Sequence, residues 1–376
     1  MATHELSSTT TQYILSALFW IIVPLLSIYV FGLYNKIVVR KYVERELEEI
    51  SEMLEKVIDM MVARAACSTE EARTIIKRAS ETIIIPPVQL DPHGIIDRLE
   101  NLLDRGEEKF KSFARVLAGG DEDRVNDFKM SLTAVVTLSN IKKLIEHWLL
   151  TASKMGSWQI LIQLKFIIPV LKEYALSNYH AAKAFLDRVP VGDSVGPMVA
   201  AYLIGDRPVR EVEKETVAAE FEHEGRRVVV VKAHGPSGNL GRIGRAVRKL
   251  IREYGDVSKV ITVDAALKLE GEPTGKVSEG VGVAMGDPGH ESYRIEEIAA
   301  EEGVDLDAVV IKMSATEAVI PMKKEIADAV PEAAERVLEL VKEAPEDTTV
   351  IVVGVGNTVG VPDNKPYVPE KGAVGG

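Results

Sequence analysis

Cysteine is nearly absent from this chain of 376 residues, and basic residues are fewer than acidic ones. The lone cysteine, Cys67, cannot form an intrachain disulfide, so the fold needs no oxidising compartment. Zinc sites built from pairs of cysteines are excluded for the same reason. Lys and Arg total 45 against 57 Asp and Glu, which leaves a net charge of −12. That balance argues against nucleic acid as a partner, because binding phosphates needs a basic surface.

Charged residues are also absent from residues 13–34, which read YILSALFWIIVPLLSIYVFGLY. A helix of this length spans about 30 Å, the thickness of the hydrocarbon core of a bilayer. A cleaved signal peptide is the alternative, but the preceding flank has no Lys or Arg and no small-residue cleavage site follows. The run therefore predicts a retained, single-pass transmembrane helix in the cell membrane.

The distribution of basic residues around this run predicts its orientation. Residues 1–12 contain a single charged residue, Glu5, whereas Lys36, Arg40, Lys41 and Arg45 follow the run closely. The positive-inside rule then places residues 1–12 outside the cell and the remainder of the chain in the cytoplasm.

Residues 35–188 have the pattern of a juxtamembrane helical region. A heptad seam of apolar residues opens it, formed by Val43, Leu47, Ile50, Leu54, Val57 and Met61. The seam predicts either a homo-oligomeric stalk or an amphipathic helix that packs on its own domain. Residues 158–171 are apolar but too short and too polar for a second span. They indicate a buried helix, with a helix lying on the membrane surface as the alternative.

From residue 189 onward, short apolar strands alternate with helices, as in a sheet covered on both faces. We expect a three-layer α/β domain over residues 189–361, with a mixed and mostly parallel sheet, followed by a flexible tail over 362–376. The expected strands are residues 216–222, 227–233, 260–264, 281–285, 309–313 and 349–355.

A glycine-rich loop at 235–245 follows the strand 227–233 and precedes a helix. Such a loop can cradle a phosphate, with backbone N–H groups at the helix start as donors. Its candidate ligand-binding residues are His234, Gly238, Asn239 and Gly241. Because it matches neither common nucleotide-binding pattern, a purely structural turn is the alternative interpretation.

Two carboxylates, Asp193 and Asp264, are the candidate catalytic residues. Parallel strands gather their exits at one edge, so both are expected at that edge, where paired carboxylates can share a proton and activate water or hold a metal. A helix N-cap is the alternative role for Asp193. His234 and His290 could complete a metal site, but the sequence identifies neither a metal nor a cofactor.

Three short motifs carry a resemblance to known enzymes. Residues 192–197 read Gly-Asp-Ser-Val-Gly-Pro, residues 261–266 read Ile-Thr-Val-Asp-Ala-Ala, and residues 354–357 read Gly-Val-Gly-Asn. Together they resemble the spore germination protease and hydrogenase-maturation protease group. The resemblance implies a phosphorylase/hydrolase-like α/β fold, with Asp193 and Asp264 in the positions of that group's functional acids. Gly192 and Asn357 are further candidate ligand-binding residues.

The motif order departs from that group, in which the Gly-x-Gly-Asn strand directly precedes the Asp-containing turn. Here the strand comes last, which a circular permutation would explain, and a permutation predicts Asn357 beside Asp193 in space. The whole chain also resembles an archaeal membrane-protein family described as domain of unknown function 1512, which implies no activity. Three hypotheses follow: a hydrolase acting on an unidentified peptide or small molecule, a phosphate- or nucleotide-binding module, and a non-catalytic membrane scaffold.

Overall fold

The computed structural model describes residues 2–83, 94–286 and 289–364. It divides into two compact units, one formed by Met1–Met53 with Ser139–Ala175 and the other by Leu54–Leu138 with the chain from Leu176 onward. Three long helices contribute to both units: α2 (Arg40–Arg64), α5 (Glu122–Met155) and α6 (Trp158–Asp187).

The first unit begins with helix α1 (Ala2–Tyr34), which continues through a π-helical turn, η1 (Asn35–Val39), into α2. The large apolar side chains of α1 between residues 13 and 34 are exposed. Among the described residues, this is the one helix that is long and apolar enough to cross a membrane.

The heptad seam of α2 is buried within the single chain. Val43, Ile50, Val57 and Met61 have no exposed surface. On the same helix the buried carboxylate of Glu46 accepts a hydrogen bond from Lys172 of α6 at 2.6 Å. The seam therefore packs intramolecularly here, and the homo-oligomer through this helix stays a prediction.

The second unit contains a seven-stranded sheet in the order β1-β2-β3-β7-β4-β6-β5. The central strands β3, β7, β4 and β6 are parallel, and β1, β2 and β5 pair antiparallel at the two sides. The expected mixed sheet is confirmed, but three of its six strand pairings are antiparallel, so the parallel pairings do not predominate as expected. Its strands are β1 (Arg210–Glu213), β2 (Thr216–His223), β3 (Arg226–Ala233), β4 (Val257–Leu267), β5 (Val277–Val281), β6 (Asp305–Met313) and β7 (Thr349–Gly354).

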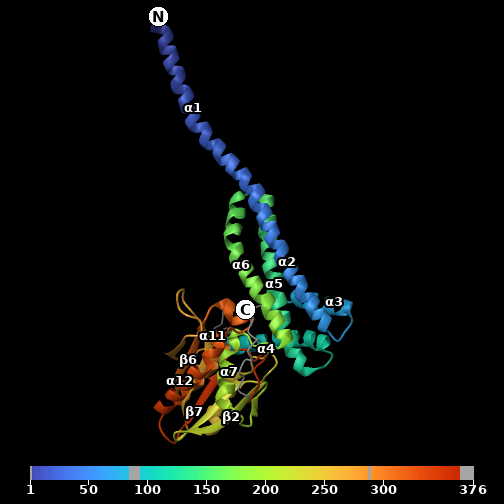
Figure 1. The fold of residues 1–376 in the computed structure, drawn as a ribbon, viewed down its shortest axis with the longest axis vertical. Helices are drawn as coiled ribbons and strands as arrows, with labels where there is room; N and C mark the ends of the chain where they lie inside the picture. The colour runs from blue at the N-terminus through green and yellow to red at the C-terminus, as the bar shows by residue number, and fades with distance from the viewer. Residues whose placement is uncertain (1, 84–93, 287–288, 365–376) are drawn as a thin grey trace. The chain divides into compact units, whose positions relative to one another are not determined.

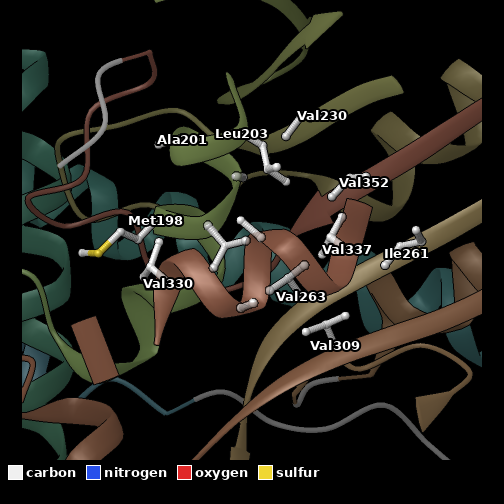
Figure 2. Packing of buried hydrophobic residues seen from close by; sticks show 14 of the residues in the cluster. Met198, Ala201, Leu203, Val230, Ile261, Val263, Val309, Val330, Val337 and Val352 are labelled. Carbon is white, nitrogen blue, oxygen red and sulfur yellow. The ribbon is translucent and has the colours of Figure 1, made fainter. Parts of the chain in front are cut away.

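Helices cover both faces of this sheet, which makes the domain three-layered. Strand β3 shows why, because Val228 and Val230 point into one core and Val229 and Val231 into the other, so both faces must be shielded from water. Helices α7 (Val195–Ile204) and α12 (Val330–Glu343) cover the first face, where Figure 2 shows side chains of α12 against those of the sheet. Helices α8 (Ile243–Tyr254) and α9 (His290–Glu302) cover the second.

The remaining helical elements of this unit are short or lie before the sheet in the chain, and Figure 1 labels most of them. They are α3 (Thr69–Ser80), α4 (Ile95–Ala118), the 3-10 turn η2 (Gly192–Ser194), α10 (Ala315–Val319) and α11 (Lys324–Asp328).

One expected strand is misplaced. The run at 281–285 is not a strand; β5 ends at Val281, whose side chain is 93% exposed. Gly282 follows with a φ of +107°, a left-handed conformation that interrupts an extended strand. The short strand β1 was not expected, because its residues are mostly polar and exposed.

Candidate functional site

Helix α7 lies directly on the sheet, and two glycines allow it. A Cβ atom on Gly196 would lie 2.1 Å from the carbonyl oxygen of Val355 and 2.3 Å from that of Val263. A Cβ atom on Gly354 would lie 2.6 Å from the Cβ of Ala200. The first turn of α7 therefore rests on β4 at Val263 and on the exit of β7 at Val355, and the 3-10 turn before it carries Asp193 to the same region.

Asp193 and Asp264 lie together at this edge, and we call them the carboxylate pair. Asp193 is half-buried, and its Oδ2 accepts a hydrogen bond from the backbone N–H of Asn357 at 2.8 Å. Asp264 is 6% exposed, and its Oδ1 accepts from the N–H of Ala265 at 2.7 Å. Among the described residues, no lysine, arginine or histidine forms a salt bridge with either carboxylate.

The surroundings of the pair favour retention of a proton. Burial, and then the negative charge of Asp193, raise the pKa of Asp264 well above its usual value. Burial also raises the pKa of Asp193, and the hydrogen bond from Asn357 opposes that shift. Two such carboxylates titrate as a unit, and a pair holding one proton offers a base and an acid side by side.

Asn357 lies beside Asp193, as a circular permutation requires. Besides its N–H contact with Asp193, its side-chain Oδ1 accepts from the N–H of Val359 at 2.9 Å. Its buried Nδ2 has no hydrogen-bond partner among the described residues. Gly356 has a φ of +126°, and a Cβ there would meet the carbonyl oxygen of Asp193 at 2.0 Å. The exit of β7 thus packs tightly on the turn that holds Asp193.

Gly192 has a structural role in this arrangement. Its N–H donates to the carbonyl of Ile320, and a Cβ there would lie 2.2 Å from the carbonyl oxygen of Glu317. Glu317 is itself buried and accepts hydrogen bonds from Thr274, Lys323 and the N–H of Ser314, which lower its pKa to about 2. Gly192 therefore packs closely against the backbone of α10, and its role in binding a ligand stays a prediction.

The glycine-rich loop does bind anions, but they are the protein's own carboxylates. The N–H of Gly238 donates to Asp127 of α5, and that of Gly244 donates to Glu291 of α9. The N–H of Gly235 donates to Asp363 at 2.8 Å. Donors that a phosphate would need are thus occupied, which favours the structural turn over the phosphate-binding interpretation.

Asn239 and Gly241 likewise hold this loop in shape. Asn239 is 1% exposed, and its Oδ1 accepts from the N–H of Gly241 at 3.1 Å. Gly241 has a φ of +67°, and a Cβ there would lie 2.7 Å from Oγ1 of Thr216. Thr358 ties the loop to the exit of β7, because its N–H donates to the carbonyl of Asn239 at 3.0 Å.

His234 belongs to a cluster that the sequence did not reveal. Its Nδ1 lies 2.6 Å from Oδ2 of Asp363, and this carboxylate raises the pKa of His234. The other oxygen of Asp363 accepts from Lys232, whose side chain is completely buried. Lys232 interrupts the apolar run of β3, and a lone charge at the end of a buried strand was the available signal.

The described residues do not include three or more His, Cys, Asp or Glu side chains placed to hold one metal ion. His234 is engaged by Asp363, and His290 is a buried side chain at the start of α9 whose pKa is lowered by burial. The carboxylate pair, holding one proton, can exchange protons with a substrate or with water.

The raised pKa of Asp264 predicts that Asp264→Asn stabilises the fold at neutral pH. A carboxyl whose folded pKa lies above its unfolded value weakens the native state as pH rises through that range, and the amide lacks this loss. We expect a gain of about 1–2 kcal/mol, as for other substitutions that relieve a functional site. Thermal unfolding at pH 5 and pH 8 measures it, with the exposed Asp206→Asn as control; a gain that does not grow with pH would contradict the argument.

A helical region joined to a three-layer α/β domain, with the carboxylate pair contributed by the turn η2 and by strand β4, defines the class of protein. Family models match both parts: the DUF1512 N-terminal domain over residues 17–188 and the DUF1512 C-terminal domain over residues 191–362. Together they cover nearly the whole chain, which belongs to the DUF1512 family, a family of unknown function. No curated protein and no solved structure matches the chain.

Proposed function

We propose that the C-terminal domain is a hydrolase in which Asp193 and Asp264 activate water. The observation that carries the proposal is the carboxylate pair itself: two acids from distant parts of the chain, adjacent at the sheet edge and without a cationic partner among the described residues. Two other carboxylates of this domain, Glu317 and Asp363, are instead paired with lysines, and their pKa values fall to about 2. A carboxyl pKa that is raised above its usual value is characteristic of residues that act in acid–base catalysis.

The proposed chemistry needs one proton on the pair. Asp193, whose ionised form accepts the hydrogen bond from Asn357, takes a proton from water as the hydroxide attacks a carbonyl carbon. Asp264 retains its proton and donates it to the carbonyl oxygen. Collapse of the tetrahedral intermediate returns a proton to the leaving amine, so a peptide bond and water yield a carboxylic acid and an amine. The resemblance of residues 192–197 to the germination protease group favours a peptide as the substrate.

We also propose that α1 anchors this hydrolase in the cell membrane with the α/β domain in the cytoplasm. Its large apolar side chains are exposed along the 13–34 run, and basic residues follow that run rather than precede it.

The hydrolase is tested with the full-length chain in detergent, a peptide library and ¹⁸O-labelled water. We expect new peptide carboxylates that carry ¹⁸O, and a loss of turnover of at least about a hundredfold in Asp193→Asn and in Asp264→Asn. The exposed Asp206→Asn removes the same charge and should retain full activity. Unchanged turnover in both pair variants, with intact folding, would refute the proposal.

A further inference from the structure

The turn between α5 and α6 exposes bulky apolar side chains. Leu150 is 60% exposed and Met155 is 71% exposed, and both lie within the last six residues of α5. Other apolar side chains of these helices, such as Phe166 and Val170, are exposed as well, so exposure alone does not distinguish the turn. Its position relative to α1 and its charges do.

Contacts within the first unit place this turn at the end of the apolar run. The rings of Phe31 and Trp158 pack edge to face with their centroids 5.5 Å apart. A Cβ on Gly32 would lie 3.4 Å from the indole of Trp158, and one on Gly156 would lie 3.8 Å from Nζ of Lys36. The turn therefore lies at the level at which α1 leaves its apolar stretch (Figure 1).

The charges around the turn are complementary to an anionic surface. Lys154 precedes Met155 and is exposed, and Lys36 and Arg40 are exposed on the adjoining part of the α1–α2 helix. Lysines with apolar residues at the tip of a helix pair are the composition of a segment that inserts at a membrane surface.

We propose that the α5–α6 turn inserts Leu150 and Met155 into the boundary between headgroups and acyl chains of the cytoplasmic leaflet. Lys36 and Lys154 then contact anionic phospholipid headgroups. This inference rests on the proposed anchoring by α1, because the Phe31–Trp158 contact sets the depth of the turn. It gives the membrane-proximal unit a second attachment, which restricts rotation about the single transmembrane helix.

The test uses nitroxide labels on the full-length chain in phosphatidylcholine vesicles that contain phosphatidylglycerol. The cysteine-free background is Cys67→Ser, and the labelled variants are Leu25→Cys, Met155→Cys and Val170→Cys. Val170 is a matched control, because it is 65% exposed but lies about 18 Å along α6 from Trp158 at 1.5 Å per residue. Relaxation of a label by oxygen shows that the label lies in lipid. Relaxation by a water-soluble nickel chelate shows that the label lies in water.

We expect labels at 25 and 155 to respond to oxygen and the label at 170 to respond to nickel. A nickel response at 155 with lipid exposure at 25 would overturn the inference and leave the anchor standing. If the label at position 25 showed no exposure to lipid, the proposed anchoring by α1 would itself be overturned. Protection of 155 from both reagents would place a second copy of the chain there and also overturn the inference.

The charge component is tested with Lys36→Gln combined with Lys154→Gln. In vesicles containing phosphatidylglycerol, this variant should lower the oxygen-to-nickel ratio at position 155 severalfold. In vesicles of phosphatidylcholine alone, the double lysine variant and the chain with both lysines should give the same oxygen-to-nickel ratio at position 155. An equal ratio in both lipids would exclude headgroup binding by these lysines.

Discussion

Asp363→Ala is expected to destabilise the second unit by about 3–5 kcal/mol, the cost of leaving a buried charge without its partner. Lys232 has no exposed surface, and its ammonium donates to Asp363 at 2.7 Å and to the carbonyl of Ala233 at 2.8 Å. Removal of Asp363 leaves the backbone carbonyl as the remaining partner of this charge among the described residues. Chemical denaturation of the full-length chain measures the loss.

The pH dependence identifies the cause of that loss. Burial lowers the pKa of Lys232, so without Asp363 the native state releases its proton more readily than the unfolded state does. The deficit of the variant should therefore narrow as pH rises toward about 10.4, the ordinary lysine value. The deficit should also narrow in acid, because the pKa of Asp363 in the parent is lowered to about 2 and the stability that this carboxylate contributes is lost as pH falls from about 4 toward 2.

A second variant separates the buried charge from other roles of Asp363. Lys232→Met combined with Asp363→Ala should recover most of the stability, since an apolar pair often replaces a buried ion pair at little cost. A chain ended after Pro362, the last residue that the family model matches, should resemble Asp363→Ala. If the double variant is no more stable than Asp363→Ala, the buried lysine is not the cause of the loss.

The layers of the α/β domain and the position of the carboxylate pair could both be predicted from the sequence, and one physical reason accounts for both predictions. Continuous apolar runs such as residues 228–231 can be strands only if both faces are covered, and parallel strands end at one edge. That rule brings Asp264 and the exit of β7 together without knowledge of the contacts. The position of Asp193 can be predicted because it directly precedes an almost wholly apolar helix, which must pack on the sheet.

The partners of the glycine-rich loop could not be predicted in this way. Asp127 lies in α5, 111 residues before Gly238, and no local pattern relates the two. Asp363 lies in a Pro- and Lys-containing stretch that reads as a tail, yet it anchors Lys232, His234 and the N–H of Gly235. The glycines indicate that backbone N–H groups of the loop are accessible. The anion to which these groups donate hydrogen bonds depends on tertiary packing.

The carboxylates that hold the glycine-rich loop differ from the carboxylate pair in their partners. Asp127, Glu291 and Asp363 accept loop N–H groups and fix the backbone. Asp193 and Asp264 also accept backbone N–H groups, but among the described residues no cation forms a salt bridge with either of them. A pair with raised pKa values, held by a rigid backbone, is the arrangement that the proposed hydrolase needs, because the surrounding fold compensates for the unfavourable pair.

The closest contact between α7 and the sheet predicts that Gly196→Ala destabilises the second unit by at least about 3 kcal/mol, the upper range for overpacking. The added methyl would lie 2.1 Å and 2.3 Å from two backbone oxygens, which cannot move as a flexible side chain can. Helix α7 must then lift from β4 and β7 and carry Asp193 away from Asp264. Denaturant unfolding measures the loss, and catalytic turnover should fall with it.

The matched control is Gly280→Ala on β5, where a Cβ would meet no atom within 4 Å, so that substitution should change stability by less than about 0.5 kcal/mol. Gly354→Ala probes the same interface from the sheet, because its Cβ would crowd Ala200 of α7. We expect it to weaken the fold as Gly196→Ala does. Parent-like unfolding of both interface variants would show that α7 does not rest on the strand ends, and the carboxylate pair would lose the contact that assembles it.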